Sequence, residues 1–389
     1  MKKKLIFITE ALWVGGIETA LINLLNRMDY GRFDVTLLVI RGSLELADRV
    51  NPQCRLIVAD RDALHSFRKP YAFRRLYHLT EESDHPSALH KAMMWSVPAI
   101  KSMENRLYAR YIQKEFAQEH YDTAIIYSDR CSEVAVKGVN ADRYLMYYHH
   151  GAMRHEFHDD YGYRRSEKII AVSEALAQQL REFRPKYADK IIAINNLVDV
   201  GGVRAKSLAQ PEIVFPQDMF NIVSCGRIAV EKGMDLAAEA CAALVQSGMT
   251  DLHWWIVGGG PAEAELREQV HRLGIEEHFH ILGMQKNPYS YIRQADLYVQ
   301  PSRFEGHSVT IMEARMLAKP ILATRAAAHE QIRDGVTGAL CETDAAALAS
   351  RIRELRNLPA LRERFRQALE QHDFEADNIA IMERLYQLF

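Results

Sequence analysis

Three things that the sequence of 389 residues lacks restrict what kind of protein it is. No apolar run approaches the ~18 residues of a membrane-spanning helix, so we expect a protein that is soluble or at most attached to a membrane surface. The five cysteines are scattered and form no CxxC pair, which favours reduced thiols in a cytosolic protein. The formal net charge is only −2, which argues against nucleic-acid binding driven by bulk charge.

The chain is long enough for two domains of roughly 150–200 residues each. Short apolar runs alternate with helical patterns in two series, as in parallel sheets that helices cover on both faces. In the first series the predicted strands are Leu5–Ile8, Asp34–Ile40, Arg55–Val58, Thr123–Tyr127, Arg143–Tyr148 and Lys168–Val172. In the second series they are Phe220–Ser224, His253–Val257, Phe279–Leu282, Leu297–Gln300 and Pro320–Ala323.

A polar stretch between the two series, Asn195–Gln217, places a domain boundary near residue 200. The predicted fold class is α/β, with two Rossmann-like domains over residues 1–200 and 201–375. Their parallel sheets are expected to face each other across a central cleft, because ligands bind such sheets at the carboxyl ends of the strands. Residues 61–116 are basic, aromatic and helical in pattern, which indicates an insertion. A last helix over residues 376–389 is expected to pack back on the first domain.

The strongest motif follows the predicted strand Leu297–Gln300. Glu305 stands in a loop, a helix is expected to begin near Ser308, and Glu313 lies inside that helix. The free N–H groups at a helix start attract phosphate. A carboxylate inside the helix is costly unless a hydroxyl-rich ligand or a cation pairs with it. Two ordinary surface glutamates are the alternative interpretation.

Glycines and cations mark the ends of other predicted strands. Arg227 and Lys232 stand five positions apart after a strand, and the two side chains offer complementary ways of holding a diphosphate. Two solvated cations beside a turn are the alternative. The turn Gly258–Gly260 permits close approach of a ligand to the backbone. It lacks the GxGxxG spacing of a dinucleotide site, which argues against a dehydrogenase.

Two further candidate ligand-binding positions lie in the first half of the chain. Gly15 and Gly16 lie between the first strand and a helix, where a simple turn with a capped helix is the alternative. A histidine at the carboxyl end of Arg143–Tyr148 points into the expected cleft. The glycine that follows favours His150 over His149 for this position.

The stretch Phe304–Pro320 resembles the signature of retaining glycosyltransferases of family four, which have the GT-B fold. That signature is a glutamate, seven residues and a second glutamate, followed by a small-residue turn, and Glu305 and Glu313 have this spacing. The resemblance implies that Glu313 binds the ribose hydroxyls of a nucleotide-sugar donor and that Glu305 lies beside the donor sugar. The backbone amides that would meet the diphosphate and sugar belong to Gly306, His307, Ser308 and Val309. His307 departs from the aromatic or apolar residue that is frequent in the family, which leaves the donor sugar open.

The same resemblance implies roles for the other marked residues. Arg227 and Lys232 would clamp the donor phosphates, and His150 would lie beside the transferred sugar, near its 6-hydroxyl. The remaining donor-binding positions would approach through their backbone: Gly15, Gly16, Gly258 and Met284.

We therefore expect a retaining glycosyltransferase that uses a nucleotide sugar, with UDP as the expected nucleotide. Its acceptor would be a saccharide or a lipid-linked saccharide of cell-envelope polysaccharide or glycolipid synthesis. The leaving diphosphate, held by Arg227 and Lys232, would help to deprotonate the acceptor hydroxyl on the same face of the sugar. The alternatives are a non-hydrolysing sugar-nucleotide epimerase of the same architecture and a catalytically idle GT-B partner subunit.

Two motifs imitate metal sites. Asp60 and Asp62 form the Asp-x-Asp that holds a metal in the other large glycosyltransferase fold. His155 and His158 could share a helix face near two aspartates, as in a zinc site, although a solvated loop is the preferred interpretation. Because Arg227 can hold the diphosphate together with Lys232, we expect no metal and no other cofactor.

The insertion interleaves basic with large apolar residues. Such a surface can bind anionic lipid. A helical subdomain with its own core is the alternative. We expect a cytoplasmic protein that can lie at the inner face of the cell membrane. The basic residues are Arg68, Lys69, Arg74, Arg75, Lys91, Lys101, Arg106 and Arg110, and the apolar ones include Tyr71, Phe73 and Trp95.

Overall fold

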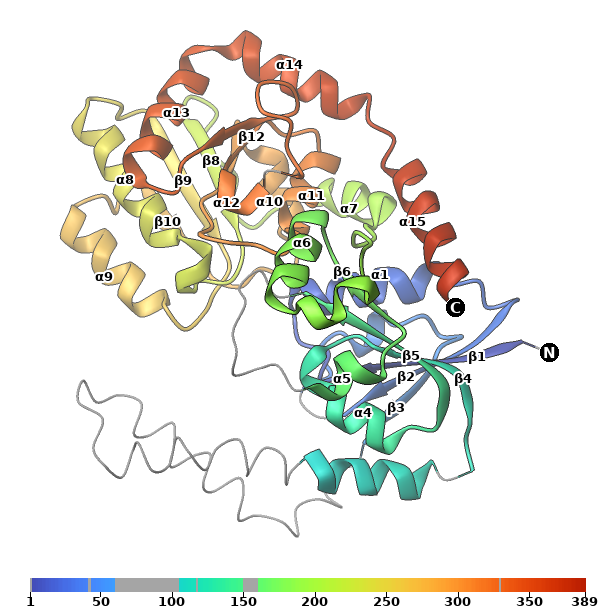
Figure 1. Cartoon of the computed structure of the whole chain (residues 1–389). Coiled ribbons are helices and arrows are strands. Elements are labelled where there is room, and N and C mark those ends of the chain that lie inside the picture. Colours follow the sequence, from blue (N-terminus) through green and yellow to red (C-terminus); the bar gives the residue numbers. More distant parts are fainter. Residues whose placement is uncertain (1, 41–42, 60–104, 117, 150–159, 329) are drawn as a thin grey trace, which may run out of the picture.

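The computed structural model describes residues 2–40, 43–59, 105–116, 118–149, 160–328 and 330–389, and it contains two parallel sheets (Figure 1). The first has the strand order β3-β2-β1-β4-β5-β6-β7, and the second has the order β10-β9-β8-β11-β12-β13. The strands of the first sheet are β1 (Lys3–Thr9), β2 (Phe33–Val39), β3 (Arg55–Val58), β4 (Tyr121–Ile126), β5 (Ala141–Tyr148), β6 (Lys168–Ala171) and β7 (Ile191–Ala193). Those of the second are β8 (Phe220–Cys225), β9 (Leu252–Val257), β10 (Phe279–Ile281), β11 (Leu297–Gln300), β12 (Ile321–Thr324) and β13 (Ala339–Cys341).

Helices connect the parallel strands, because a parallel pair needs a long crossover. In the first half of the chain they are α1 (Gly16–Arg27), α4 (Ser132–Gly138), α5 (Asp160–Arg165) and α6 (Glu174–Phe183). In the second half they are α8 (Met234–Gln246), α9 (Glu263–Leu273), α10 (Tyr289–Gln294), α11 (Val309–Met316) and α12 (Arg325–Ala328). Helix α7 (Val200–Ser207) lies between the two sheets in the chain, and three helices follow the last strand: α13 (Ala345–Asn357), α14 (Pro359–Glu370) and α15 (Phe374–Leu388). Short 3₁₀ helices include η1 (Ala47–Arg49) and η6 (Val230–Lys232).

The strands of the second sheet are apolar throughout because helices cover both faces of the sheet. Neighbouring residues of a strand point to opposite faces, and here both faces are buried. Ile222 and Trp254 pack with α8, α9 and α13, whereas Val223 and Trp255 pack with α10 and α11. The predicted α/β class with two Rossmann-like domains is therefore confirmed.

Two strands were absent from the sequence prediction. β7 and β13 have three residues each and lie at the edges of their sheets. A run of three residues is too short to show a period, although β10, which is equally short and also lies at an edge, was predicted from the apolar ends of Phe279–Leu282. The predicted strands Arg55–Val58 and Leu297–Gln300 have the bounds of β3 and β11.

The chain crosses from one domain to the other twice, and the two crossing segments are hydrogen-bonded to each other. Val198, just before α7, donates its N–H to the side chain of Asn378 at 3.1 Å, and Asn378 Nδ2 donates back to the Val198 carbonyl at 2.9 Å. Helix α15 leaves the second domain and lies against the first (Figure 1). Its end is buried there, with the ring of Phe389 6.0 Å from that of Phe7.

Candidate active site

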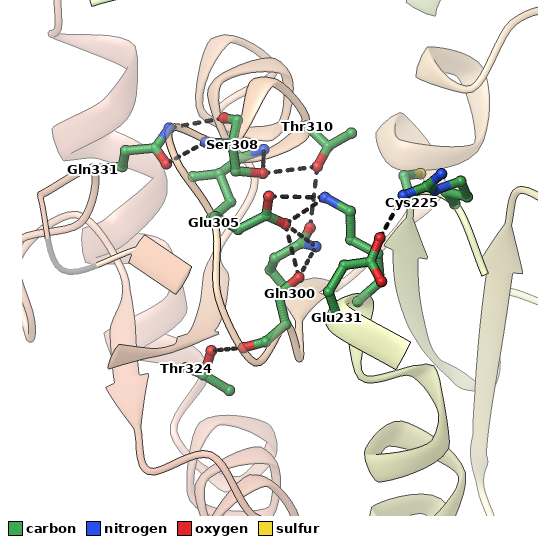
Figure 2. A network of polar contacts seen from close by, with 12 residues as sticks. Cys225, Glu231, Gln300, Glu305, Ser308, Thr310, Thr324 and Gln331 are labelled. Atoms are coloured by element: carbon green, nitrogen blue, oxygen red, sulfur yellow. Dashed lines mark hydrogen bonds and ion pairs between the residues drawn. The ribbon is translucent and has the colours of Figure 1, made fainter. Parts of the chain in front are cut away.

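The loop between β11 and α11 carries the Glu-x7-Glu stretch, and its backbone is fixed from two sides. Ser308 caps α11, since its hydroxyl accepts from the Ile311 N–H at 3.4 Å. Gln331 bonds both backbone groups of Ser308, accepting from its N–H at 2.9 Å and donating to its carbonyl at 2.8 Å (Figure 2). The expected helix start at Ser308 is thus where α11 begins, and the end of the preceding loop is fixed by these hydrogen bonds.

Lys232, the last residue of η6, forms an ion pair with Glu305 of this loop. Lys232 Nζ lies 2.7 Å and 2.8 Å from the two carboxylate oxygens. Ser302 Oγ donates to the same carboxylate at 2.8 Å, and the amide of Gln300 donates to Ser302 (Figure 2). Only 9% of the Glu305 side chain is exposed. A carboxylate this buried needs a cation and hydrogen-bond donors; η6 supplies the cation, and the loop supplies the Ser302 hydroxyl.

Arg227 is arranged differently from Lys232. Its side chain is 64% exposed and pairs with Glu231, four positions along the chain. An exposed guanidinium in such a pair gains little stability from it. Arg227 is therefore accessible to an anionic ligand, whereas Lys232 would meet a ligand only beside Glu305.

Glu313 lies inside α11 and is 7% exposed. Burial raises the pKa of its carboxyl to about 7, and the hydrogen bond from the Tyr289 hydroxyl, at 3.0 Å, acts in the opposite direction. The group borders a cavity of about 100 Å³ between α1, α7, α10 and α11. Within the described residues its direct partner is thus a neutral hydroxyl rather than the cation that burial of a carboxylate usually demands.

A second cavity, of about 200 Å³, lies between α6 and the loop that carries Glu305. The loop touches the first domain here: a side-chain carbon on Gly306 would lie 2.4 Å from the carbonyl oxygen of His149. His307 also lines this cavity, and burial, with nearby Arg315, lowers the pKa of its imidazole to about 4. His307 is therefore neutral at pH 7.

Glu330, which no sequence pattern marked, also borders the second cavity. Its carboxylate accepts from the backbone N–H groups of Glu174 and Ala175 in the first turn of α6. A carboxylate at a helix N-terminus is stabilised by the free N–H groups and the helix dipole. Glu330 thus links the second domain to α6 of the first.

The backbone packing around the turn after β9 explains why a glycine stands there. Gly258 has φ +149°, and a side-chain carbon there would lie 1.9 Å from the Gly226 carbonyl oxygen. Its N–H donates to the Gly283 carbonyl at 2.9 Å. Glycine is therefore required by the close approach of the backbone at the ends of β8, β9 and β10. Met284, directly after this contact, is 62% exposed.

The glycines of the first domain also lie at the cleft. Gly15 caps α1 in an extended conformation, and Gly16 faces the side chain of Val309 at the start of α11. The N-termini of α1 and α11 therefore approach each other. His149 stacks on Tyr147, with the ring centroids 5.6 Å apart.

Several predicted residues lie outside the described part of the chain. They are His150, His155, His158, Asp60, Asp62 and the basic residues between 68 and 101. Arg106 and Arg110 are exposed on a helical segment over residues 105–115. Among the described residues no group of three or more histidine, cysteine or acidic side chains could hold a metal ion. No helix of that same part is long and apolar enough to cross a membrane.

Part of the second domain matches a known protein family. Residues 220–357 match the family model described as "Glycosyl transferases group 1". The lipopolysaccharide core biosynthesis glycosyltransferase LpsD of Rhizobium meliloti is 28% identical over 207 residues, 52% of this chain and 57% of that protein. An N-acetylgalactosaminyltransferase of Campylobacter jejuni, named for a diphospho-undecaprenol substrate, is 28% identical over 47% of this chain and 48% of that protein. The chain thus spans about half the length of these curated relatives.

Solved structures match over the whole chain. Anabaena HepE, crystallised with UDP and glucose, has a TM-score of 0.69 and 17% identity, with 99% of both chains covered. TarM of S. aureus has a TM-score of 0.72 and 13% identity, again with 99% of both chains covered. At such identities the likeness concerns the fold. The chain therefore has the predicted GT-B fold, and its residues 220–357 match a glycosyltransferase family.

Proposed function

We propose that the chain is a glycosyltransferase that moves a sugar from a nucleotide-sugar donor to a saccharide or lipid-linked acceptor of the cell envelope. The observation that carries this proposal is the Lys232–Glu305 pair, 2.7 Å apart, directly before the N-terminus of α11. A cation and free helix N–H groups suit a diphosphate, and a carboxylate beside them suits sugar hydroxyls. The glycosyltransferase match of residues 220–357 and the names of the relatives support it.

The donor would lie across the N-terminus of α11. Arg227, Lys232 and the amides from Gly306 to Val309 would hold the diphosphate, with Gly15 and Gly16 approaching from the first domain. Glu305 would accept from the sugar hydroxyls, and Glu313 from those of the ribose. UDP is the proposed nucleotide, since HepE was crystallised with it.

Transfer would proceed on one face of the sugar, with retention of the anomeric configuration. The bond between the anomeric carbon and the phosphate oxygen breaks, and its electron pair leaves with the nucleoside diphosphate. The acceptor oxygen forms the new bond to that carbon, and its proton passes to the leaving phosphate oxygen. Arg227 and Lys232 would stabilise the charge that develops on the diphosphate, the kind of interaction that lowers a barrier most.

No metal is needed in this scheme, because the diphosphate already has two cations and a helix N-terminus. His150 would contact the transferred sugar; it lies outside the described residues. We also propose that the protein acts in the cytoplasm at the inner face of the membrane, where a lipid-linked acceptor would be presented.

A panel of UDP-, GDP- and ADP-sugars, each with and without lipid-linked acceptors, tests the proposal. We expect nucleoside diphosphate and glycosylated acceptor to appear together, and only when both substrates are present. NMR of the product should show the anomeric configuration of the donor. Interconversion of a nucleotide sugar without acceptor would instead indicate an epimerase. Nucleotide binding with no reaction on any acceptor would indicate a partner subunit.

A further inference from the structure

Glu313 has one direct hydrogen-bond partner within the described residues, the hydroxyl of Tyr289 at 3.0 Å. The other titratable groups near the carboxyl come from separate elements. Lys206 of α7, Arg49 of η1 and Asp199, which caps α7, line the same cavity. The thiol of Cys225, at the end of β8, interacts with Glu313 electrostatically. Of these groups, Lys206 favours the ionised carboxyl, and only Tyr289 bonds to it.

The Tyr289 hydroxyl is held in a fixed place. Tyr289 is the first residue of α10, and its ring packs against the apolar clusters on both sides of α11. The loop before it is tied to α7, because Asn287 Nδ2 donates to the Lys206 carbonyl at 2.8 Å. Burial and the adjacent Glu313 raise the pKa of the Tyr289 phenol far above its usual value. The phenol therefore keeps its proton and can donate it to the ionised carboxyl.

We propose that Tyr289 is a positioning residue for the nucleotide: its hydroxyl keeps the Glu313 carboxyl ionised and turned toward the ribose. The inference rests on the proposed function, in which Glu313 accepts the ribose hydroxyls. An ionised carboxylate accepts through both oxygens, whereas a protonated one must itself donate through one of them. With the pKa of Glu313 raised to about 7 by burial, the form that binds ribose is only partly populated at neutral pH. Loss of a hydrogen bond to the charged form would depopulate it further.

The test is Tyr289→Phe, which removes one oxygen atom and keeps the ring. Infrared difference spectra, from which those of Glu313→Gln are subtracted, report the titration of the Glu313 carboxyl without any ligand. We expect its midpoint to rise by about one pH unit, the usual scale for losing a hydrogen bond to a charged group. Calorimetry with UDP should show affinity reduced about five-fold to ten-fold at pH 7. That affinity should recover to the wild-type value above pH 9.

The matched control is Tyr144→Phe. Tyr144 is a buried tyrosine, 5% exposed, whereas Tyr289 is partly buried; the Tyr144 hydroxyl likewise donates to an acceptor, the Val139 carbonyl at 2.6 Å in the first domain. This variant should leave both the carboxyl titration and the pH profile of UDP binding unchanged.

Three results would overturn the inference. An unchanged carboxyl midpoint in Tyr289→Phe would do so, whatever happens to thermal stability. A loss of affinity that is equal at every pH would mean that the hydroxyl binds the nucleotide directly. A shift of the midpoint without any effect on UDP binding would separate Tyr289 from the nucleotide. If the wild-type protein binds no nucleotide, the proposed function fails, whereas the carboxyl titration alone still decides whether Tyr289 controls Glu313.

Discussion

Replacing Glu313 by Gln should make the free protein more stable at alkaline pH, although it removes a residue of the proposed site. Burial raises the pKa of the carboxyl from its ordinary 4.5 to about 7. The unfolded chain therefore releases its proton at lower pH than the folded one, and stability falls as the pH rises through the window between these values. Above pH 7 the full cost is about 3 kcal/mol, since one pKa unit corresponds to about 1.4 kcal/mol.

The amide that Glu313→Gln introduces carries no charge to desolvate and can still accept from the Tyr289 hydroxyl. Scanning calorimetry at pH 8 should show a gain in Tm of about 8 °C for the second domain. At pH 4.5 the two proteins should unfold at nearly the same temperature.

Glu133→Gln is the control for this comparison. Glu133 is also buried, 5% exposed, but it has a cation, with Lys137 Nζ at 2.6 Å, and accepts from the Asn105 amide. Its neutralisation breaks an ion pair whose carboxylate is buried and should lower stability at pH 8. A Glu313→Gln protein that is no more stable than wild type at pH 8 would refute the reasoning that burial of this carboxylate is uncompensated.

The remaining predictions concern catalysis and location. Arg227→Ala and Lys232→Ala should each lower kcat at saturating donor more than they change Tm, and a variant with wild-type kcat would exclude that residue from the phosphate clamp. Transfer should survive EDTA; loss of activity that Mg²⁺ or Mn²⁺ restores would instead favour Asp60 and Asp62 as metal ligands. The protein should float with anionic vesicles at low salt, since each basic residue near the surface contributes about 1 kcal/mol. Flotation should be lost when five residues of the insertion are neutralised or truncated, and equal binding by that variant would contradict membrane contact: Arg74, Arg75, Trp95, Lys101 and Arg106.

The regular parts of the fold were predictable because each strand carries its own signal. The residues of β1 are apolar without interruption from Leu5 to Ile8, and all four are fully buried. The start of α11 was likewise readable, since Ser308 is a capping residue that precedes a helical pattern. Three residues at a sheet edge show no period; of the three edge strands of this length, β10 was predicted and β7 and β13 were missed.

The pairing of side chains in the site was less predictable. Sequence patterns report burial within one element, whereas Lys232 and Glu305 come from elements 73 residues apart. The sequence indicated that both lie at the cleft, but their ion pair depends on how the two loops pack. Nothing in the sequence marks Tyr289 as the partner of Glu313, or Glu330 as an acceptor for the first N–H groups of α6. Gly258 was interpreted as a place for a ligand to approach, and the structure adds a close contact with the Gly226 backbone.

The central claim is that the cleft beside α11 holds a nucleotide diphosphate, and calorimetric titration at pH 8 tests it most directly. UDP, GDP and ADP would be titrated into the wild-type protein, Lys232→Met and Glu313→Gln. We expect UDP to bind to the wild-type protein with one site per chain. Each variant should bind at least about ten-fold more weakly, the effect of losing one charge-assisted contact. Absence of binding by all three nucleotides, or wild-type affinity in both variants, would contradict it.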